Sequence, residues 1–557
     1  MGSRQQITDG NETRGGSLVL LLHAHLPYCR KPKHPVSLEE NWFFEALTEC
    51  YLQLVRVLDR LERDGITPRL TLSLSPTLIC LLGDQSLLDQ YRRRLALAEK
   101  IAERDAQSGE FQEAAARQAR FFAETRHTWE ERCGGDPLGV FREYAETGRI
   151  ELATTAATHA FLPAYQARPH IVESQIRVGI DCFEKTFEHR PGFFWLPECG
   201  YFPGIETMLE AAGVRAFGLE SHAITRARPA PERGVRSPLR CPNGLVGFGR
   251  DEAISRLVWS AAEGYPGHPD YREFHRDRIH ELPESILGEW LRETGVRLPA
   301  GLKYWRVTGP EQEKALYDAR AAAARAREHA EHFLEVVRRA DRDDGGNPDD
   351  GIRFAPFDAE LFGHWWFEGP LWLEELFRAL SRQNELVPVT ATEAVAGCHR
   401  PAEGCPAPSS WGDRGDNSHW INRETDWIYP ILFEADHRLR KLLQRHGGAP
   451  GNSPEGRALR QACRTFLLAQ ASDWPFMIRA GTAADLAVRH MEGLLGRLRR
   501  LLADLEDGRI DRKFLSECEA TDRAFPELKV DHFTPARHAG SGSPEKSASI
   551  QPRRQTL

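Results

Sequence analysis

The sequence lacks the features of a secreted, disulfide-bonded or membrane protein. Its 11 cysteines are scattered and include no Cys-x-x-Cys pair, which favours reduced thiols over a disulfide framework or a zinc site. No apolar run approaches the roughly 20 residues that a membrane helix needs. The first 16 residues are polar and do not resemble a signal peptide. We therefore expect a cytoplasmic protein with no membrane partner.

Positive charge and nucleotide-binding motifs are also scarce. The formal net charge is −8 and no long basic run occurs, so a nucleic-acid partner is not expected. No Gly-x-Gly-x-x-Gly follows the first predicted strand, which disfavours a dinucleotide-binding fold. At 557 residues, 41% of them hydrophobic, the chain can form one large domain and a smaller one. A monomer is the working expectation for its assembly.

Short apolar segments alternate with helical patterns over the first 400 residues. A strand at 18–22, a helix at 41–65 and a strand at 69–75 have the spacing of a βαβ unit, so the sheet should be parallel. Further strands are predicted at 150–154, 193–196, 214–219, 245–248, 352–357 and 386–389. About seven such strands form either an open doubly wound sheet or a barrel. Polar residues at most strand ends favour a seven-stranded (β/α) barrel.

The same patterns predict the domain boundaries. A charged, Ala-rich helical insertion at about 87–140 and a second excursion at about 255–308 interrupt a catalytic barrel spanning 17–400. Strand signals then stop, and residues 401–525 are expected to form an all-α C-terminal domain. Its helices are predicted at 427–445, 453–471 and 482–505. Residues 1–16 and 526–557 are polar and are expected to be disordered tails.

Two acids follow predicted buried strands. The apolar run 193–196 ends at Pro197 and is followed by Glu198, and Asp358 follows the strand 352–357. Glycoside chemistry needs one acid to protonate the leaving oxygen and another to attack the anomeric carbon or activate water. Glu360 competes with Asp358, because residues two apart share one face of a strand. The alternative is that one of these acids is only an ion-pair partner.

Histidines follow other strands, and they allow two interpretations. His23 and His25 could bind a metal together with His159, His222 and Asp358. Hydrogen bonding to a polar substrate explains the same residues with fewer assumptions. No dense ligand motif such as His-Glu-x-x-His occurs, so we expect neither a metal nor another cofactor.

Tryptophan is abundant in the C-terminal half. For each residue, packing in the core is the commoner role, but the set also suits stacking on sugar rings. Trp411 lies in a turn-rich Pro-Ser-Ser-Trp-Gly-Asp sequence, which favours it as a sugar platform. The set comprises Trp365, Trp366, Trp411, Trp420, Trp427 and Trp474.

Taken in order, these motifs resemble glycoside hydrolase family 57, and within it the branch of 1,4-α-glucan branching enzymes. The resemblance covers most of residues 17–525. The motifs that carry it are His23-Ala-His-Leu-Pro-Tyr28, Ala157-Thr-His-Ala-Phe-Leu-Pro163, Trp195-Leu-Pro-Glu-Cys-Gly-Tyr201, Phe357-Asp-Ala-Glu-Leu-Phe-Gly-His-Trp-Trp366 and Ala471-Ser-Asp-Trp-Pro-Phe476. The segments 258–260, 264–267 and 408–412 match that branch too.

The resemblance implies a barrel, a C-terminal helical domain that closes over a cleft, and no metal. It implies that Glu198 is the nucleophile and Asp358 the general acid/base of a retaining mechanism acting on an α-glucan. A chain cut at an α-1,4 link would then pass to a glucan 6-hydroxyl. The substrate-binding residues that we assign with this resemblance are His23, His25, His159, Arg250, Trp259, Trp411, Trp420 and Asp473.

One loop departs from the pattern of the branching enzymes. Between His222 and Asn243 the resemblance leads us to expect a tyrosine-bearing active-site loop, but the sequence has Arg233 and Arg236 there. Poor shielding from water would favour hydrolysis, so an amylase-like hydrolase or a 4-α-glucanotransferase is the alternative. A catalytically weak glucan-binding protein is the alternative from another class.

Overall fold

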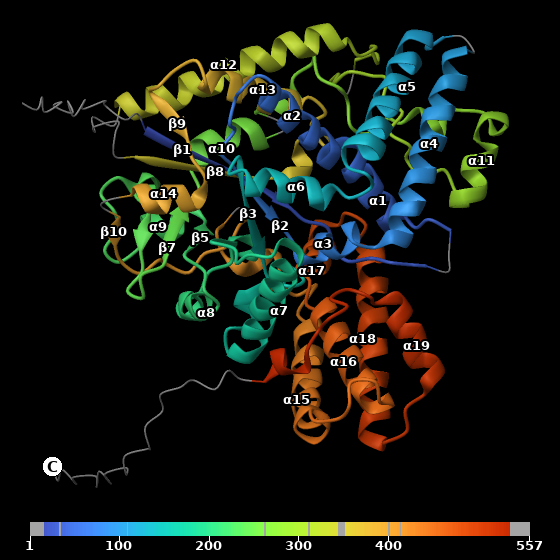
Figure 1. Cartoon of the computed structure of the whole chain (residues 1–557), viewed down its shortest axis with the longest axis vertical. Coiled ribbons are helices and arrows are strands. Elements are labelled where there is room, and N and C mark those ends of the chain that lie inside the picture. Colours follow the sequence, from blue (N-terminus) through green and yellow to red (C-terminus); the bar gives the residue numbers. More distant parts are fainter. Residues whose placement is uncertain are drawn as a thin grey trace, which may run out of the picture.

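The computed structural model describes residues 16–32, 35–107, 110–260, 263–309, 312–343, 351–398, 401–412 and 414–534. Seven parallel strands curl into a barrel, in the order β7-β5-β4-β3-β2-β1-β8 (Figure 1). These strands are β1 (Gly16–Ala24), β2 (Leu70–Leu74), β3 (Ile150–Thr155), β4 (Phe193–Trp195), β5 (Ala216–Leu219), β7 (Val246–Gly249) and β8 (Ile352–Asp358). The predicted seven-stranded α/β barrel with additional helices is therefore confirmed.

The last seam of the barrel lies between β7 and β8. Arg250, directly after β7, pairs with Phe354 in parallel register, and the Asp251 N–H donates to the Phe354 carbonyl at 2.9 Å. A buried ion pair between Asp251 and Arg353, 2.5 Å apart, reinforces the seam. Side chains from all around the barrel fill its interior, which is a packed core and not a pore. They include Val19, Leu21, Ala153, Phe193, Trp195, Ala216, Val246, Phe248 and Phe354.

Three short strands lie outside the barrel. The predicted strand at 386–389 is β9 (Leu386–Pro388), which pairs with the first residues of β1, beside the start of the barrel. The sequence pattern makes it a candidate barrel strand, but the seven barrel strands form without it. β6 (Leu239–Arg240) and β10 (Ala402–Glu403) pair with each other and extend from β7. Two residues are too few to give a strand pattern in the sequence.

Helices cover the outside of the barrel and project from it. α1 (Leu38–Ala46) begins at a capping box of Ser37 and Glu40, slightly before the predicted cap at Asn41. It continues through a π-helical turn, η1 (Leu47–Tyr51), into α2 (Leu52–Arg63). Between β2 and β3 lie α3 (Pro76–Leu82), α4 (Gln85–Gln107), α5 (Gln112–His127), η2 (Thr128–Arg132) and α6 (Pro137–Glu146). In Figure 1, α4 and α5 stand side by side and project from the barrel.

The remaining barrel helices follow later strands. η3 (Leu162–Tyr165) and α7 (Pro169–Phe187) follow β3, α8 (Ile205–Ala211) follows β4, and α9 (Ser221–Thr225) follows β5. The segment between β7 and β8 contains α10 (Glu252–Trp259), α11 (Glu284–Thr294) and α12 (Ala319–Asp343). After β8 come η9 (Ala359–Leu361), α13 (Gly369–Leu380) and α14 (Ala391–Gly397).

The C-terminal region is a helical bundle packed against one end of the barrel (Figure 1). It consists of α15 (Ile428–His446), α16 (Pro454–Leu468), α17 (Asp473–Ala480), α18 (Ala484–Asp507) and α19 (Arg512–Thr521). The backbone joins bundle and barrel directly, because the Ser472 N–H donates to the His159 carbonyl at 3.1 Å. Among the described residues, no helix is both long and apolar enough to cross a membrane.

The residues directly after 525 form a packed helical turn, and the prediction of a disordered tail is wrong for them. The polar composition predicts a disordered tail from residue 526 onward, but η11 (Val530–Phe533) packs on α7, with His532 and Phe533 buried. Arg177 donates to the Thr534 carbonyl at 2.9 Å. A few widely spaced apolar residues in a polar stretch gave no helical or strand pattern, although they are enough to dock it. Residues 1–15 and 535–557 lie outside the described residues.

Truncation tests the docking of this segment. Compared with a chain ending at residue 534, a chain ending at 525 loses the buried Leu528 and Phe533. Burial of such a side chain is worth about 1.5–3 kcal/mol, so we expect the shorter chain to lose about 3 kcal/mol and several degrees in Tm. Equal melting temperatures for the two truncations in a fluorescence melt would show that the segment contributes nothing.

Candidate active site

Glu198 lies at a sharp turn at the carboxyl end of β4. Its backbone, and that of Cys199, are in the left-handed region, at φ 58° and 51°. Such conformations cost on the order of 1–3 kcal/mol each and persist only where surrounding contacts impose them. One such contact is the Trp411 N–H, which donates to the Glu198 carbonyl at 2.6 Å. The turn and this bond fix the direction of the carboxylate.

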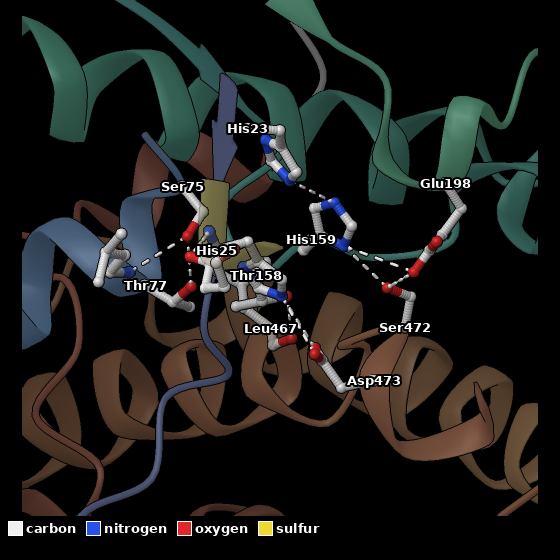
Figure 2. Close-up of polar contacts among 12 residues, drawn as sticks. His23, His25, Ser75, Thr77, Thr158, His159, Glu198, Leu467, Ser472 and Asp473 are labelled. Carbon is white, nitrogen blue, oxygen red and sulfur yellow. Dashed lines mark hydrogen bonds and ion pairs between the residues drawn. The ribbon is translucent and has the colours of Figure 1, made fainter. Parts of the chain in front are cut away.

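A chain of hydrogen bonds leads from the barrel to Glu198 (Figure 2). Ser73 lies 3.3 Å from His23 Nδ1, His23 Nε2 lies 3.0 Å from His159 Nε2, and His159 Nδ1 lies 2.9 Å from Ser472 Oγ. Ser472 donates to Glu198 Oε1 at 2.8 Å. His159 Nδ1 is 3.7 Å from the same oxygen.

One set of proton positions satisfies the whole chain. The Ser472 hydroxyl donates to the Glu198 carboxylate, so the Ser472 oxygen accepts from His159 Nδ1–H. With its proton on Nδ1, His159 must accept at Nε2, and the donor there is His23 Nε2–H. His23 Nδ1 in turn accepts from the Ser73 hydroxyl. This order requires neutral imidazoles, and burial lowers the pKa of both His23 and His159 well below the usual value. Every proton in the chain points towards Glu198.

His25 makes a different contact from its two neighbours. Its ring stacks on His159 with centroids 4.1 Å apart, and Nε2 lies 3.1 Å from Asp473 at the start of α17. Burial lowers the pKa of His25, but the carboxylates of Asp473, Glu360 and Glu198 together outweigh this and raise it overall. Among the described residues, no group of three or more His, Cys, Asp or Glu side chains is placed to hold a metal ion.

Asp358 ends β8, in register with His23 of β1. Burial raises its pKa well above the usual value, and the negative charges of Glu360 and Glu198 add to the effect. Burial also raises the pKa of Glu198, to about 7, with Asp473 contributing, while Ser472, His25 and Trp420 act in the opposite direction. Glu198 and Asp358 thus share one desolvated region in which like charges oppose each other.

Aromatic side chains extend from this region in order of increasing exposure. Trp195 is buried, and its ring centroid lies 5.9 Å from that of the half-buried Trp411. Trp411 is followed by Trp259 at 5.5 Å and Trp259 by Trp365 at 6.4 Å. Trp259 and Trp365 are 36% and 47% exposed. This row forms an apolar surface from the barrel end to solvent.

The other assigned residues take up separate places. Arg250 donates to Glu220 at 3.2 Å and lies over the Trp411 ring at 5.3 Å. Trp420 is almost completely buried and stacks on Phe161 with centroids 4.4 Å apart. The structure thus brings His23, His25, His159 and Asp473 together beside Glu198, whereas Arg250, Trp259 and Trp411 form a neighbouring group.

Several residues of the site were not assigned from the sequence. Ser472 immediately precedes Asp473 within a recognised motif, so the motif itself was a signal for it. Ser73 gave a weaker signal as a polar residue at the end of a strand. Trp365 was assigned only to the general set of tryptophans, because its exposure beside Trp259 depends on how the segment after β8 folds.

Comparisons with known proteins place the chain in a family. A model described as glycosyl hydrolase family 57 matches residues 19–403. The chain belongs to glycoside hydrolase family 57. A second model, described as the C-terminal region of 1,4-alpha-glucan branching enzyme, matches residues 432–533 of this family 57 protein.

Individual relatives of this family 57 protein carry two activities in their names. A 1,4-alpha-glucan branching enzyme of Thermococcus kodakarensis is 32% identical over 96% of this chain and 80% of its own length. A solved branching enzyme of Pyrococcus horikoshii superposes with a TM-score of 0.83 at 30% identity, covering 95% of this chain and 98% of its own. A solved alpha-amylase of Thermotoga maritima superposes with a TM-score of 0.85 at 35% identity, covering 93% and 99%.

The raised pKa of Glu198 predicts a stability effect that depends on pH. A carboxyl whose pKa rises from 4.5 to about 7 on folding destabilises the native state progressively between these values, because the unfolded chain ionises first. At 1.36 kcal/mol per pH unit, this destabilisation is at most about 3 kcal/mol. It is smaller than that limit because the Glu198 side chain is 19% exposed. Glu198→Gln should therefore raise the Tm at pH 8 relative to the unmodified protein, and change it little at pH 4.5. The same Tm difference at both pH values would contradict the buried-carboxyl interpretation.

Proposed function

We propose that this family 57 protein is a 1,4-α-glucan branching enzyme that works by retaining double displacement. The observation that carries the proposal is the pair of electrostatically coupled, desolvated acids at the ends of β4 and β8. The match of its C-terminal region to the branching-enzyme model supports the choice among family members. The substrate would be an α-glucan of the amylose or glycogen type.

In the first step, Glu198 attacks the anomeric carbon of an α-1,4 link while Asp358 donates its proton to the departing oxygen. Retaining enzymes form a covalent glycosyl intermediate in this way. The hydrogen-bond chain through Ser472 supports this role for Glu198, since it favours the charged carboxylate and fixes its direction. Loss of the proton leaves Asp358 as a base.

In the second step, Asp358 removes a proton from the 6-hydroxyl of a glucan. The oxygen attacks the anomeric carbon, the bond to Glu198 breaks and releases the carboxylate, and an α-1,6 branch forms. The row Trp411, Trp259 and Trp365 supports an α-glucan substrate, because sugar rings stack on aromatic faces. We assign His23, His25, His159 and Asp473 to the sugar next to Glu198, and Arg250 to the orientation of Trp411.

Hydrolysis is the second candidate, and specific observations favour it. No tyrosine occurs from Phe202 to Gly264, in the region where shielding of the intermediate was expected. One solved relative at 35% identity is named an alpha-amylase. If water reaches the intermediate, the same two acids release a shortened chain instead of a branch.

The cellular setting belongs to the same proposal. The 11 cysteines are scattered and include no Cys-x-x-Cys pair, as is usual in a reducing compartment, so we place the enzyme in the cytoplasm. There it would act in the biosynthesis of a glycogen-like glucan.

Substitution of the two acids tests the mechanism. Glu198→Gln and Asp358→Asn should each lower turnover of amylose by at least about 10²–10⁴-fold while retaining a cooperative melt. As a matched control, Glu206→Gln changes an acid that binds the Gly204 N–H outside the proposed site, and it should keep its turnover. Wild-type turnover in either of the first two variants would refute the assigned roles.

Product analysis tests branching against hydrolysis. Amylose is incubated with the purified enzyme, and proton NMR follows α-1,6 signals together with new reducing ends. We expect α-1,6 signals to rise with few new reducing ends, because in a branching enzyme the intermediate passes to a sugar hydroxyl and not to water. Reducing ends without α-1,6 signals would replace the branching proposal by hydrolysis on the same scaffold.

A further inference from the structure

The π-helical turn η1 faces the segment that carries Asp358. The Cys50 thiol donates to the Ala359 carbonyl at 2.9 Å, and the Tyr51 hydroxyl donates to Glu360 Oε1 at 2.5 Å. One residue earlier, Glu49 Oε2 accepts from His364 Nδ1 at 2.8 Å. An extra residue in a helical turn redirects the side chains that follow, and such turns are frequent at functional sites. Here three consecutive buried side chains contact the residues after β8.

The approach of the two segments depends on a glycine. Gly363 has φ 114°, and a Cβ there would lie 1.8 Å from the Glu49 carbonyl oxygen. Glu49 also accepts from Arg272 at 2.7 Å. Burial would raise the pKa of Glu49, but Arg272 and His364 outweigh it and lower the pKa to about 2. The segment is therefore fixed on both sides of Glu360.

Asp358 and Glu360 differ sharply in their hydrogen bonds. Glu360 Oε1 accepts from the Tyr51 hydroxyl and from the His25 backbone N–H, at 2.5 and 3.0 Å. Over the described residues, the Asp358 side chain receives no hydrogen bond from the protein. Donors aimed at a carboxyl favour its charged form. The charge of this pair is therefore stabilised on Glu360 and not on Asp358.

We propose that Glu360 is a positioning residue that keeps the proton of the pair on Asp358, with Tyr51 of the π-helical turn holding Glu360 in its charged form. The inference rests on the proposed function, in which Asp358 protonates the leaving oxygen. It gives a role to an acid that takes no direct part in the reaction, and it accounts for the π-helical turn.

The charges around the pair agree with this arrangement. The pKa of Asp358 is raised mainly by burial and then by the charges of Glu360 and Glu198, whereas His25 and Arg250 lower it. Burial raises the pKa of Glu360 as well, but Tyr51 and the backbone N–H and charge of His25 oppose the rise. The Cys199 thiol near Asp358 and the Cys50 thiol near Glu360 stay protonated, since burial raises both pKa values well above the usual one.

The pH dependence of kcat/KM for Glu360→Gln tests the proposal. Glutamine keeps an oxygen for Tyr51 and His25 but removes the negative charge, so Asp358 should lose its proton more easily. We expect the alkaline limb of the profile to move down by roughly one pH unit, with KM and the rate below the limb unchanged. An unmoved alkaline limb, or an equal loss of rate at every pH, would overturn the proposal.

Tyr51→Phe is the second variant, and it carries the test if Glu360→Gln does not fold. It keeps the charge but removes the donor, so the proton shifts towards Glu360, and kcat/KM near the alkaline limb should fall several-fold. Cys50→Ala is the matched control, because it loosens the same segment through Ala359 only and should leave the limb in place. A limb that moves equally in Cys50→Ala would indicate a merely structural effect.

The failure of this inference can be told apart from failure of the proposed function. If Asp358→Asn retains full turnover, the assignment of the general acid is wrong. If Asp358→Asn is inactive and the limb of Glu360→Gln stays in place, the assignment stands and only the role of Glu360 is refuted.

Discussion

Two acids held close together and away from water are the constraint on which the rest of this structure depends. Burial raises the pKa of both acids, and the charge of Glu198 raises the pKa of Asp358 further. The barrel brings them together because parallel strands end at one edge. The surroundings then divide their roles, since Ser472 donates to Glu198 and no protein donor among the described residues reaches Asp358. One acid is thus supported as an anion and the other as a proton donor.

The barrel supplies both acids, but the C-terminal bundle completes their environment. Ser472 and Asp473 come from the start of α17, and they contact Glu198 and His25 of the barrel. The Ser472 N–H also bonds to the His159 carbonyl, at a residue with φ 53°. The strained turn at His159 and the hydrogen-bond chain through its ring therefore depend on the same docking. Movement of α17 would remove the donor to Glu198, the proposed nucleophile, and the partner of His25 together.

The sequence predicts those parts of the site that depend on strand ends alone. His23, Glu198 and Asp358 each follow an apolar run, so topology suffices to bring them to one edge. The choice between Asp358 and Glu360 cannot be made from spacing, because both share a face. In our proposal it depends on Tyr51, which reaches Glu360 from a distant π-helical turn. Ser472 likewise acquires its role only through docking of the bundle. The burial of Phe533 was missed because packing on α7, α15 and α16, and not a local pattern, orders that segment.

The difference between branching and hydrolysis must arise outside the groups that form the intermediate. In the proposed mechanism both outcomes use Glu198, Asp358, Ser472 and the histidines equally, since water and a sugar hydroxyl attack the same carbon and lose a proton to the same base. The second chain must therefore be held in place for longer than water can compete. The exposed faces of Trp259 and Trp365 offer such a surface beside the barrel end, whereas the loop at 222–243 has arginines where a shielding tyrosine was expected. Under the proposed function, glucan retention on the tryptophans and access of water at that loop would together set the balance of the two outcomes.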